Sequence, residues 1–367
     1  MNNPFAPSTS RPGHGSIVLA LLPPSTPVLQ TVTYQYPLKL IAPEPQPVAP
    51  NSPASYTPRT VHTVHTVFVL TYGGGLVAGD TITLRVTLAP ATRLVLLTQG
   101  STKIFKAAAA PAPRLRSGQT TDVRVAPGAA LCFLPDPVQP FADSGFAQTQ
   151  RYVLLAPRAG ADEPVGSLCV LDWVSEGRGA LGEHWDFREY VSKNEVWLAP
   201  EGAALEHKDG DGAGRGRLLL RDNVILRNER EGGAGAASVA SAGTVIGRMD
   251  SLAAFGTLIL YGPVFATLAQ YFMDEFAAMP RIGAKKWHTS PPGEQQALTP
   301  QEAIRAARLQ QEADDGVLWT AAAVRGSVLV KFGAKSVEGA RRWLGSMIKS
   351  EGTVERQFGE RSVLCLK

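Results

Sequence analysis

Cysteine is scarce in this chain: among 367 residues there are three, Cys132, Cys169 and Cys365, each in apolar surroundings and far from the others. No CxxC or CxxxC pair occurs, which argues against a thiolate zinc site. Isolated cysteines of this kind are typical of small buried side chains in a reducing compartment. The first residues also lack a charged segment followed by an apolar core of signal length, so we expect a cytoplasmic protein.

Charge is low and nearly balanced. Lys and Arg number 36 against 32 Asp and Glu, which gives a formal net charge of +4, and no run of five basic residues occurs. Binding to nucleic acid needs a concentrated basic surface, so we expect no nucleic acid partner.

One uncharged stretch, 252–273, is long enough to span a bilayer. Gly256, Gly262 and Pro263 divide it into a strand-like half and a helix-like half. This division predicts a buried strand followed by a helix, and no membrane as a partner.

The composition is that of a soluble globular protein, with 44% hydrophobic and 19% charged residues. We predict a flexible tail over 1–12 and a single domain over 13–367, because β-rich folds of this length often form one unit. Stretches rich in proline, or in glycine and alanine, predict loop insertions near 42–58, 202–216 and 229–243, and we expect a further insertion near 283–314.

Short apolar runs separated by proline and glycine recur along the chain, which is typical of an all-β scaffold. From residue 81 the strands expected from alternation are Thr81–Leu88, Arg93–Thr98, Thr120–Val125, Ala130–Leu134, Ala147–Leu155, Ser167–Trp173, His184–Ser192, Glu195–Leu198 and Arg217–Leu226. No internal repeat occurs. We therefore expect a mainly β fold, an irregular β-helix or β-sandwich-like scaffold of many short strands.

The C-terminal third changes character. Helical spacing of apolar residues predicts helices over Val264–Met279, Pro300–Ala313 and Val337–Lys349. Between the last two, alternation over 316–323 and 327–332 predicts a hairpin that turns at Arg325 and Gly326.

A glycine-rich run, Gly73-Gly74-Gly75, follows a β-branched segment and is itself followed by Gly79 and Asp80. A dinucleotide-binding loop needs a helix directly after the glycines, whereas period-two alternation follows here. A Walker loop needs Lys and Ser or Thr where Asp80 and Thr81 stand, and a carboxylate there repels phosphate. The glycines are better interpreted as a tight crossing with positive φ that places Asp80, although Asp80 could also simply cap a turn.

Two blocks in this order and about this far apart are specific: Gly74-Gly75-Leu76-Val77-Ala78-Gly79-Asp80, and Thr98-Gln99-Gly100-Ser101-Thr102-Lys103. Together they resemble the paired hallmark of the UreD family of urease accessory proteins, also called UreH. Further blocks that resemble this family in the same order are Leu134–Ala142, Leu171–Arg178 with Gly182-Glu183 and Phe187, Ser192–Val196, and Leu219–Asp222. Tyr72, Ala78 and Phe105 depart from the residues usual in the family. The long loops are more typical of eukaryotic, fungal members.

The resemblance implies a nickel-insertion chaperone that assists urease apoprotein together with the accessory protein UreF and the GTPase UreG, without an enzymatic activity of its own. Ni²⁺ lies near the top of the Irving–Williams order, so it must be escorted past stronger ligands. The sequence lacks a histidine-rich tract, and His62 and His65 lie three apart on an expected strand, so they face opposite sides. Oxygen ligands spaced along the chain suit weak, transient contacts with nickel(II) in transit, and we expect no tightly bound cofactor.

The residues carried over by motif as lining a metal-transfer conduit are Asp80, Thr102, Asp172 and Asp222, with Glu183 as a fifth. For each, a turn cap or a salt bridge is the alternative. The residues expected to support the motifs structurally are Gly74, Gly75, Gly79, Gly100, Lys103, Gly177 and Arg178, with Lys103 and Arg178 pairing with acids because like charge repels Ni²⁺.

Two other functions stay open. The protein could be a pure scaffold that links UreF to urease without touching metal. It could instead be a β-rich glycoside hydrolase that uses Asp172 and Glu183, with Glu176 nearby, because two carboxylates at a set separation can hydrolyse a glycosidic bond. The cysteine usage and the N-terminal sequence argue against a secreted polysaccharide enzyme.

Overall fold

A computed structural model describes residues 11–48, 62–106, 115–160, 162–205, 207, 216–228, 244–279 and 300–367. Residues 1–10 of the tail expected over 1–12 lie outside the described residues. So do the expected loop 229–243 and the parts 49–58, 208–215 and 283–299 of the other insertions.

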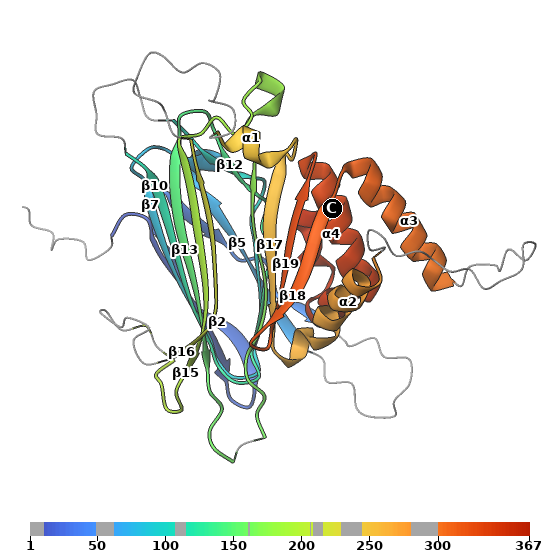
Figure 1. Cartoon of the computed structure of the whole chain (residues 1–367). Coiled ribbons are helices and arrows are strands. Elements are labelled where there is room, and N and C mark those ends of the chain that lie inside the picture. The colour runs from blue at the N-terminus through green and yellow to red at the C-terminus, as the bar shows by residue number, and fades with distance from the viewer. Residues whose placement is uncertain are drawn as a thin grey trace, which may run out of the picture.

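Two β-sheets face each other across a shared core (Figure 1). The first sheet has the strand order β16 (Arg217–Arg227), β15 (Glu189–Ala199), β13 (Gly145–Leu155), β10 (Ser117–Val125), β7 (Thr81–Leu88), β1 (His14–Leu22) and β2 (Thr26–Tyr34). The second sheet follows the order β18 (Leu318–Val324), β19 (Ser327–Ala334), β17 (Ala254–Tyr261), β14 (Ser167–Ser175), β11 (Ala130–Phe133), β8 (Arg93–Leu97), β5 (His62–Thr71) and β3 (Leu38–Ile41). Four short strands join it: β4 (Gln46–Val48), β6 (Gly75–Leu76), β9 (Thr102–Ile104) and β12 (Val138–Pro140).

The middle of the chain winds between the two sheets. From β7 to β15 the longer strands fall alternately in the first and the second sheet, and within each sheet these strands are parallel to their predecessors. This is a flattened, irregular β coil that forms a sandwich. The expectation of a mainly β fold is confirmed.

The helices form a third layer on the outer face of the second sheet (Figure 1). They are α2 (Ala266–Ala277), α3 (Pro300–Asp315), α4 (Val337–Glu351) and α5 (Thr353–Phe358), while the short α1 (Val245–Met249) lies at one end of the sandwich. The three longer helices match the helices predicted from the sequence.

Ser336 caps α4 by accepting a hydrogen bond from the Gly339 amide, and Gly352 ends it at φ 83°.

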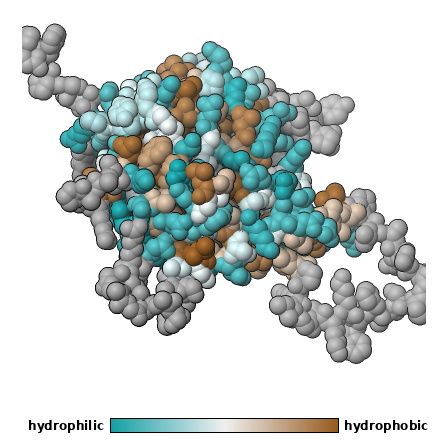
Figure 2. Space-filling model, turned by 90° about the horizontal axis from the view of Figure 1, so that it is seen from above, coloured by the Kyte–Doolittle hydropathy of each residue, from teal (hydrophilic) through white to brown (hydrophobic). Residues whose placement is uncertain are grey.

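Alternation along the strands divides the apolar residues between two cores. In β14, Leu168 and Val170 face the first sheet, whereas Cys169 and Leu171 face the helices. Seen from above (Figure 2), hydrophobic residues form several separate patches among hydrophilic ones.

The uncharged stretch 252–273 forms β17 and most of α2, as expected. No helix in the described ranges has the length and apolar character needed to cross a membrane.

The prediction of two strands over His184–Ser192 and Glu195–Leu198 is wrong, because one strand, β15, runs from Glu189 to Ala199. Asn194 and Glu195 do not interrupt the strand, since each is buried with polar partners of its own. The residues before Glu189 form a turn in which Trp185 has φ 60°. The proline-rich segment 42–58 was expected to be a loop, but Gln46–Val48 forms the short strand β4 beside β5.

Candidate functional site

The glycine-rich run forms a turn and a short strand that enters the second sheet. Gly73, Gly74 and Gly79 have φ of 72°, 73° and 95°, as the crossing requires. Gly75 has a different role, because its backbone is extended and an added Cβ would lie 2.3 Å from the carbonyl oxygen of Lys103. The strand β7 follows at Thr81, so no helix terminus is available for a phosphate.

Asp80 is half-buried at the end of this loop. Its Oδ2 accepts a hydrogen bond of 3.1 Å from the Val77 amide, and its own amide donates to the Val77 carbonyl at 3.0 Å. In this structure Asp80 therefore caps a turn.

Asp172 lies between the two sheets and is 5% exposed. Its Oδ1 accepts a hydrogen bond of 2.7 Å from Gln148 Nε2 on β13. Its Oδ2 accepts hydrogen bonds from Ser192 Oγ and from Asn194 Nδ2 on β15. A carboxylate of the second sheet is thus held by side chains of the first.

Asp222 lies opposite, on β16, and is 7% exposed. Its Oδ2 accepts a hydrogen bond of 3.0 Å from Thr257 Oγ1 on β17, and its Oδ1 lies 2.6 Å from Lys331 Nζ on β19. Here a carboxylate of the first sheet is held by side chains of the second.

Strand register explains why these side chains gather. Asp172 pairs with Thr257, which pairs with Lys331, and Asn194 pairs with Asp222 in the facing sheet. We call the resulting set the interior polar row; its members are Gln148, Asp172, Ser192, Asn194, Asp222, Thr257 and Lys331.

Burial dominates the electrostatics of the row. It raises the pKa of the Asp172 carboxyl, as does the negative charge of Asp222, while the hydrogen bonds from Ser192 and Asn194 lower it. Burial also raises the pKa of Tyr190, whose hydroxyl lies 3.4 Å from Asp172 Oδ1. Asn194 Oδ1 is buried without a hydrogen-bond partner, which leaves an acceptor inside the sandwich.

A small cavity of about 40 Å³ adjoins this row. Thr102 lines it together with Asp172 and Gln148, so the predicted residue Thr102 shares a cavity with the row. The volume is enough for a few water molecules at most.

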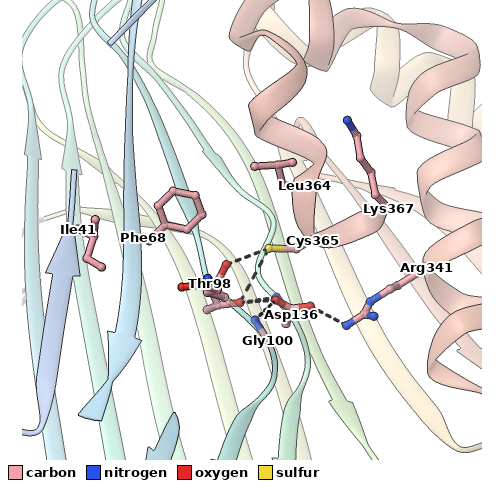
Figure 3. A pocket seen from close by; sticks show the side chains of 10 residues that line it. Ile41, Phe68, Thr98, Gly100, Asp136, Arg341, Leu364, Cys365 and Lys367 are labelled. Atoms are coloured by element: carbon pink, nitrogen blue, oxygen red, sulfur yellow. Dashed lines mark hydrogen bonds and ion pairs between the residues drawn. The ribbon is translucent and has the colours of Figure 1, made fainter. Parts of the chain in front are cut away.

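A larger pocket of about 520 Å³ lies on the other face of the second sheet, between β3, β5 and the C-terminal helices (Figure 3). Asp136 lines this pocket and lies between Thr98 and Arg341 (Figure 3). Asp136 Oδ2 accepts hydrogen bonds from Thr98 Oγ1 at 3.0 Å and from the Gly100 amide at 2.8 Å. Its Oδ1 lies 2.6 Å from Arg341 Nη2 on α4.

Glu183 lies in a different setting. It forms a two-point ion pair with Arg178 and accepts a hydrogen bond of 3.2 Å from the Ala142 amide. The Arg178 hydrogen bond lowers the pKa of the Glu183 carboxyl. The interactions of Asp80 and Glu183 do not reach the interior polar row.

The supporting motif residues shape turns. Gly100 has φ 83° and Gly177 has φ 117°, where an added Cβ would lie 2.9 Å from the Pro140 carbonyl oxygen. Lys103 is exposed. Within the described ranges, no group of three or more His, Cys, Asp or Glu side chains is placed to hold a metal ion.

The sequence did not predict most of the side chains that contact Asp172 and Asp222. It also did not predict the ion pair between Asp136 and Arg341. A signal for the row was present: Gln148 on β13, and Ser192 and Asn194 on β15, stand at every second position beside the apolar Phe146 and Tyr190. Polar residues on the apolar face of an alternating strand indicate a polar interior.

Comparison with known proteins identifies the same family throughout. A family model described as "UreD urease accessory protein" matches residues 13–363. "Urease accessory protein 4" of Cryptococcus neoformans var. grubii is 30% identical over 262 residues, which are 67% of this chain and 69% of that protein. The "Uncharacterized urease accessory protein ureD-like" of Schizosaccharomyces pombe is 28% identical over 311 residues, 84% of each chain. "Urease accessory protein UreD" of Anaeromyxobacter is 28% identical over 335 residues, 91% of this chain and 84% of that protein.

Proposed function

The chain belongs to the UreD family of urease accessory proteins, and from this premise we propose that it assists the incorporation of nickel into urease apoprotein, together with the accessory protein UreF and the GTPase UreG. The space between its two sheets forms part of the path along which Ni²⁺ passes. The observation that carries this proposal is the interior polar row, which places two carboxylates inside a sandwich that apolar side chains otherwise fill.

Burying such a row has a cost. Each polar group gives up water, and an apolar side chain at the same position would pack without that penalty. Asn194 Oδ1 is left without a partner although the residue is fully buried. Positions where a sequence departs from a simple apolar core are often functional, which favours a role for the row beyond stability.

The oxygen atoms of the interior polar row suit weak, transient binding of a metal ion. Asp172 and Asp222 offer carboxylate oxygens, and Ser192 and Thr257 offer hydroxyl oxygens. Oxygen ligands hold Ni²⁺ less firmly than imidazole or thiolate, and transport requires binding weak enough to release the ion. In this role Gln148 and Asn194 orient the Asp172 carboxylate between the sheets.

Lys331 stands at the outer end of the row, where its side chain is 32% exposed. Its ammonium group neutralises Asp222 and would repel Ni²⁺ while it stays there. A long side chain that already reaches solvent can turn outward, so Lys331 acts as a movable counter-ion at that end.

The two alternatives to this function are a glycoside hydrolase and a pure scaffold. A glycoside hydrolase needs both carboxylates to face one sugar-sized cleft, whereas Glu183 is bound by Arg178 and Asp172 adjoins a cavity of about 40 Å³. We therefore propose no catalytic activity. A pure scaffold that links UreF to urease without contacting metal is the remaining competitor, and in it the row would serve only to join the sheets.

Nickel loading of urease separates conduit from scaffold. We expect the variant that combines Asp172→Asn with Asp222→Asn to assemble with UreF, UreG and urease. The nickel content of the matured urease should fall by about tenfold or more, because a loss of about 1.4 kcal/mol in Ni²⁺ binding at the row already corresponds to a factor of ten. Nickel would be measured by elemental analysis of purified urease, with complex assembly checked by pull-down.

Glu312→Gln is the matched control. Glu312 is also a buried acid, 5% exposed, but it lies in the helix layer and accepts a hydrogen bond from Trp343 Nε1. It should load nickel normally. Unchanged loading by an assembled Asp172→Asn, Asp222→Asn variant would favour the scaffold.

A further inference from the structure

The second sheet is interrupted between β8 and β9 and between β11 and β12. β8 ends at Leu97 and β9 begins at Thr102, while β11 ends at Phe133 and β12 begins at Val138. The neighbouring strand β14 runs through without interruption from Ser167 to Ser175. Two adjacent strands therefore break at the same level, and residues 98–101 and 134–137 bridge the gap.

This break lies between the two cavities. The 520 Å³ pocket on the helix side and the 40 Å³ cavity on the inner side share two lining residues, Thr98 and Asp136. The inner cavity is also lined by Asp172 of the interior polar row. Asp136 and Thr98 thus separate an open pocket from the interior of the sandwich.

Asp136 is held from both segments and from the helix layer. Thr98 and Gly100 donate to one carboxylate oxygen, and Arg341 binds the other (Figure 3). Arg341 lies on α4, outside the sheet, and its side chain is 24% exposed. The counter-ion of Asp136 therefore comes from the pocket side and can leave without opening the sheet.

We propose that the break is a passage through the second sheet, that Asp136 is a binding site for a divalent cation within it, and that Arg341 is the counter-ion the cation displaces. This inference rests on the proposed function, because it supplies the route by which Ni²⁺ reaches the interior polar row. Asp136 Oδ1 and Thr98 Oγ1 provide the oxygen ligands, and water in the pocket completes the coordination of the ion.

Exchange of the Arg341 guanidinium for Ni²⁺ keeps a cation beside the Asp136 carboxylate and adds one positive charge to the site. While Arg341 is in place it satisfies Asp136 and excludes a divalent ion by repulsion. Once the guanidinium turns into the pocket, Asp136 is a buried carboxylate that needs a cation. Removing Arg341 should therefore expose a Ni²⁺ site that the wild-type protein hides.

Equilibrium dialysis of the full-length protein against Ni²⁺ tests this site directly. We expect Arg341→Gln to bind one more Ni²⁺ than the wild type, or the same ion about tenfold more tightly, as expected when a neighbouring positive charge is removed. Arg341→Lys, which keeps the charge, should behave as the wild type. The added binding should be lost when Asp136→Asn is combined with Arg341→Gln.

Nickel loading of urease then separates this inference from the function on which it rests. Loading reduced by Asp136→Asn and by the Asp172→Asn, Asp222→Asn variant supports both. Loading reduced by the latter variant alone, or Ni²⁺ binding unchanged by Arg341→Gln, overturns the passage at Asp136 and leaves the proposed function in place. Loading unchanged in both overturns the proposed function itself. If Asp136→Asn does not fold, the difference in Ni²⁺ binding between Arg341→Gln and Arg341→Lys still tests the proposed site.

Discussion

At the scale of single residues, Asp172 and Glu183 are two carboxylates whose surroundings act in opposite directions. Burial raises the pKa of Asp172, although four side chains donate hydrogen bonds to its carboxylate. The hydrogen bond from Arg178 lowers the pKa of Glu183. Both carboxyl groups belong to sequence motifs of the family, but their environments differ. Asp172 is shielded from water inside the sandwich, whereas Glu183 is paired with the guanidinium of Arg178.

The pH dependence of stability should differ in sign between these two residues. Asp172 keeps its proton to a higher pH in the folded than in the unfolded chain, so stability falls as pH rises from the unfolded value of about 3.8 through the raised folded pKa. Glu183 gives up its proton more readily when folded, so its contribution is present above about 4.5 and is lost as pH falls through the lowered folded pKa.

Urea unfolding at several pH values measures both effects. Relative to Asp172→Asn, the wild type should gain stability as pH falls from 7 toward 4. Relative to Glu183→Gln, it should lose stability as pH falls below about 4.5. A common sign for the two pairs would contradict the contrast in their environments.

At the scale of elements, alternation and helical spacing predicted most strands and the three longer helices, because burial on one face leaves its period in the sequence. The contacts between side chains of different strands could not be predicted in this way. Asp172 and Asp222 were placed by motif, but Thr257 and Lys331 become their partners only through the register of strands far apart in the chain. Asp136 lies within one of the family motifs, but its place between two cavities depends on a gap between strands that no local pattern in the sequence reveals.

The loop that carries the glycines offers a test of two different requirements for glycine. Gly74 has φ 73° with open space where a Cβ would lie, so Gly74→Ala should cost only about 1 kcal/mol of backbone strain. Gly75 is extended, but its Cβ would lie 2.3 Å from the Lys103 carbonyl oxygen, where β6 pairs with β9. Gly75→Ala should therefore cost about 3 kcal/mol, by forcing two backbones apart.

Chemical denaturation of the two variants measures these costs. The ratio is informative because both substitutions add the same methyl group within one loop. An equal or smaller loss for Gly75→Ala would mean that β6 and β9 are not held as closely as the structure places them.

At the scale of the whole molecule, the second sheet is shared by two cores. Residues of β14 alternate between the core that lies against the first sheet and the core that lies against the helices. The strand cannot leave one core without leaving the other. We therefore expect the three layers to unfold together, as a single domain would.

Trp343→Ala in α4 tests this cooperativity. Trp343 is 1% exposed, and its ring lies 5.4 Å from that of Trp319 and 5.3 Å from that of Phe332. Its truncation should lower the free energy of unfolding by about 3–5 kcal/mol. If the layers are coupled, hydrogen exchange should show protection falling by a similar amount in α4 and in the distant strands β13 and β15. Leu364→Ala, at a side chain 44% exposed, should change little. Protection lost in α4 but kept in β13 and β15 would mean that the helix layer opens by itself, and the Asp136–Arg341 contact would then open with it.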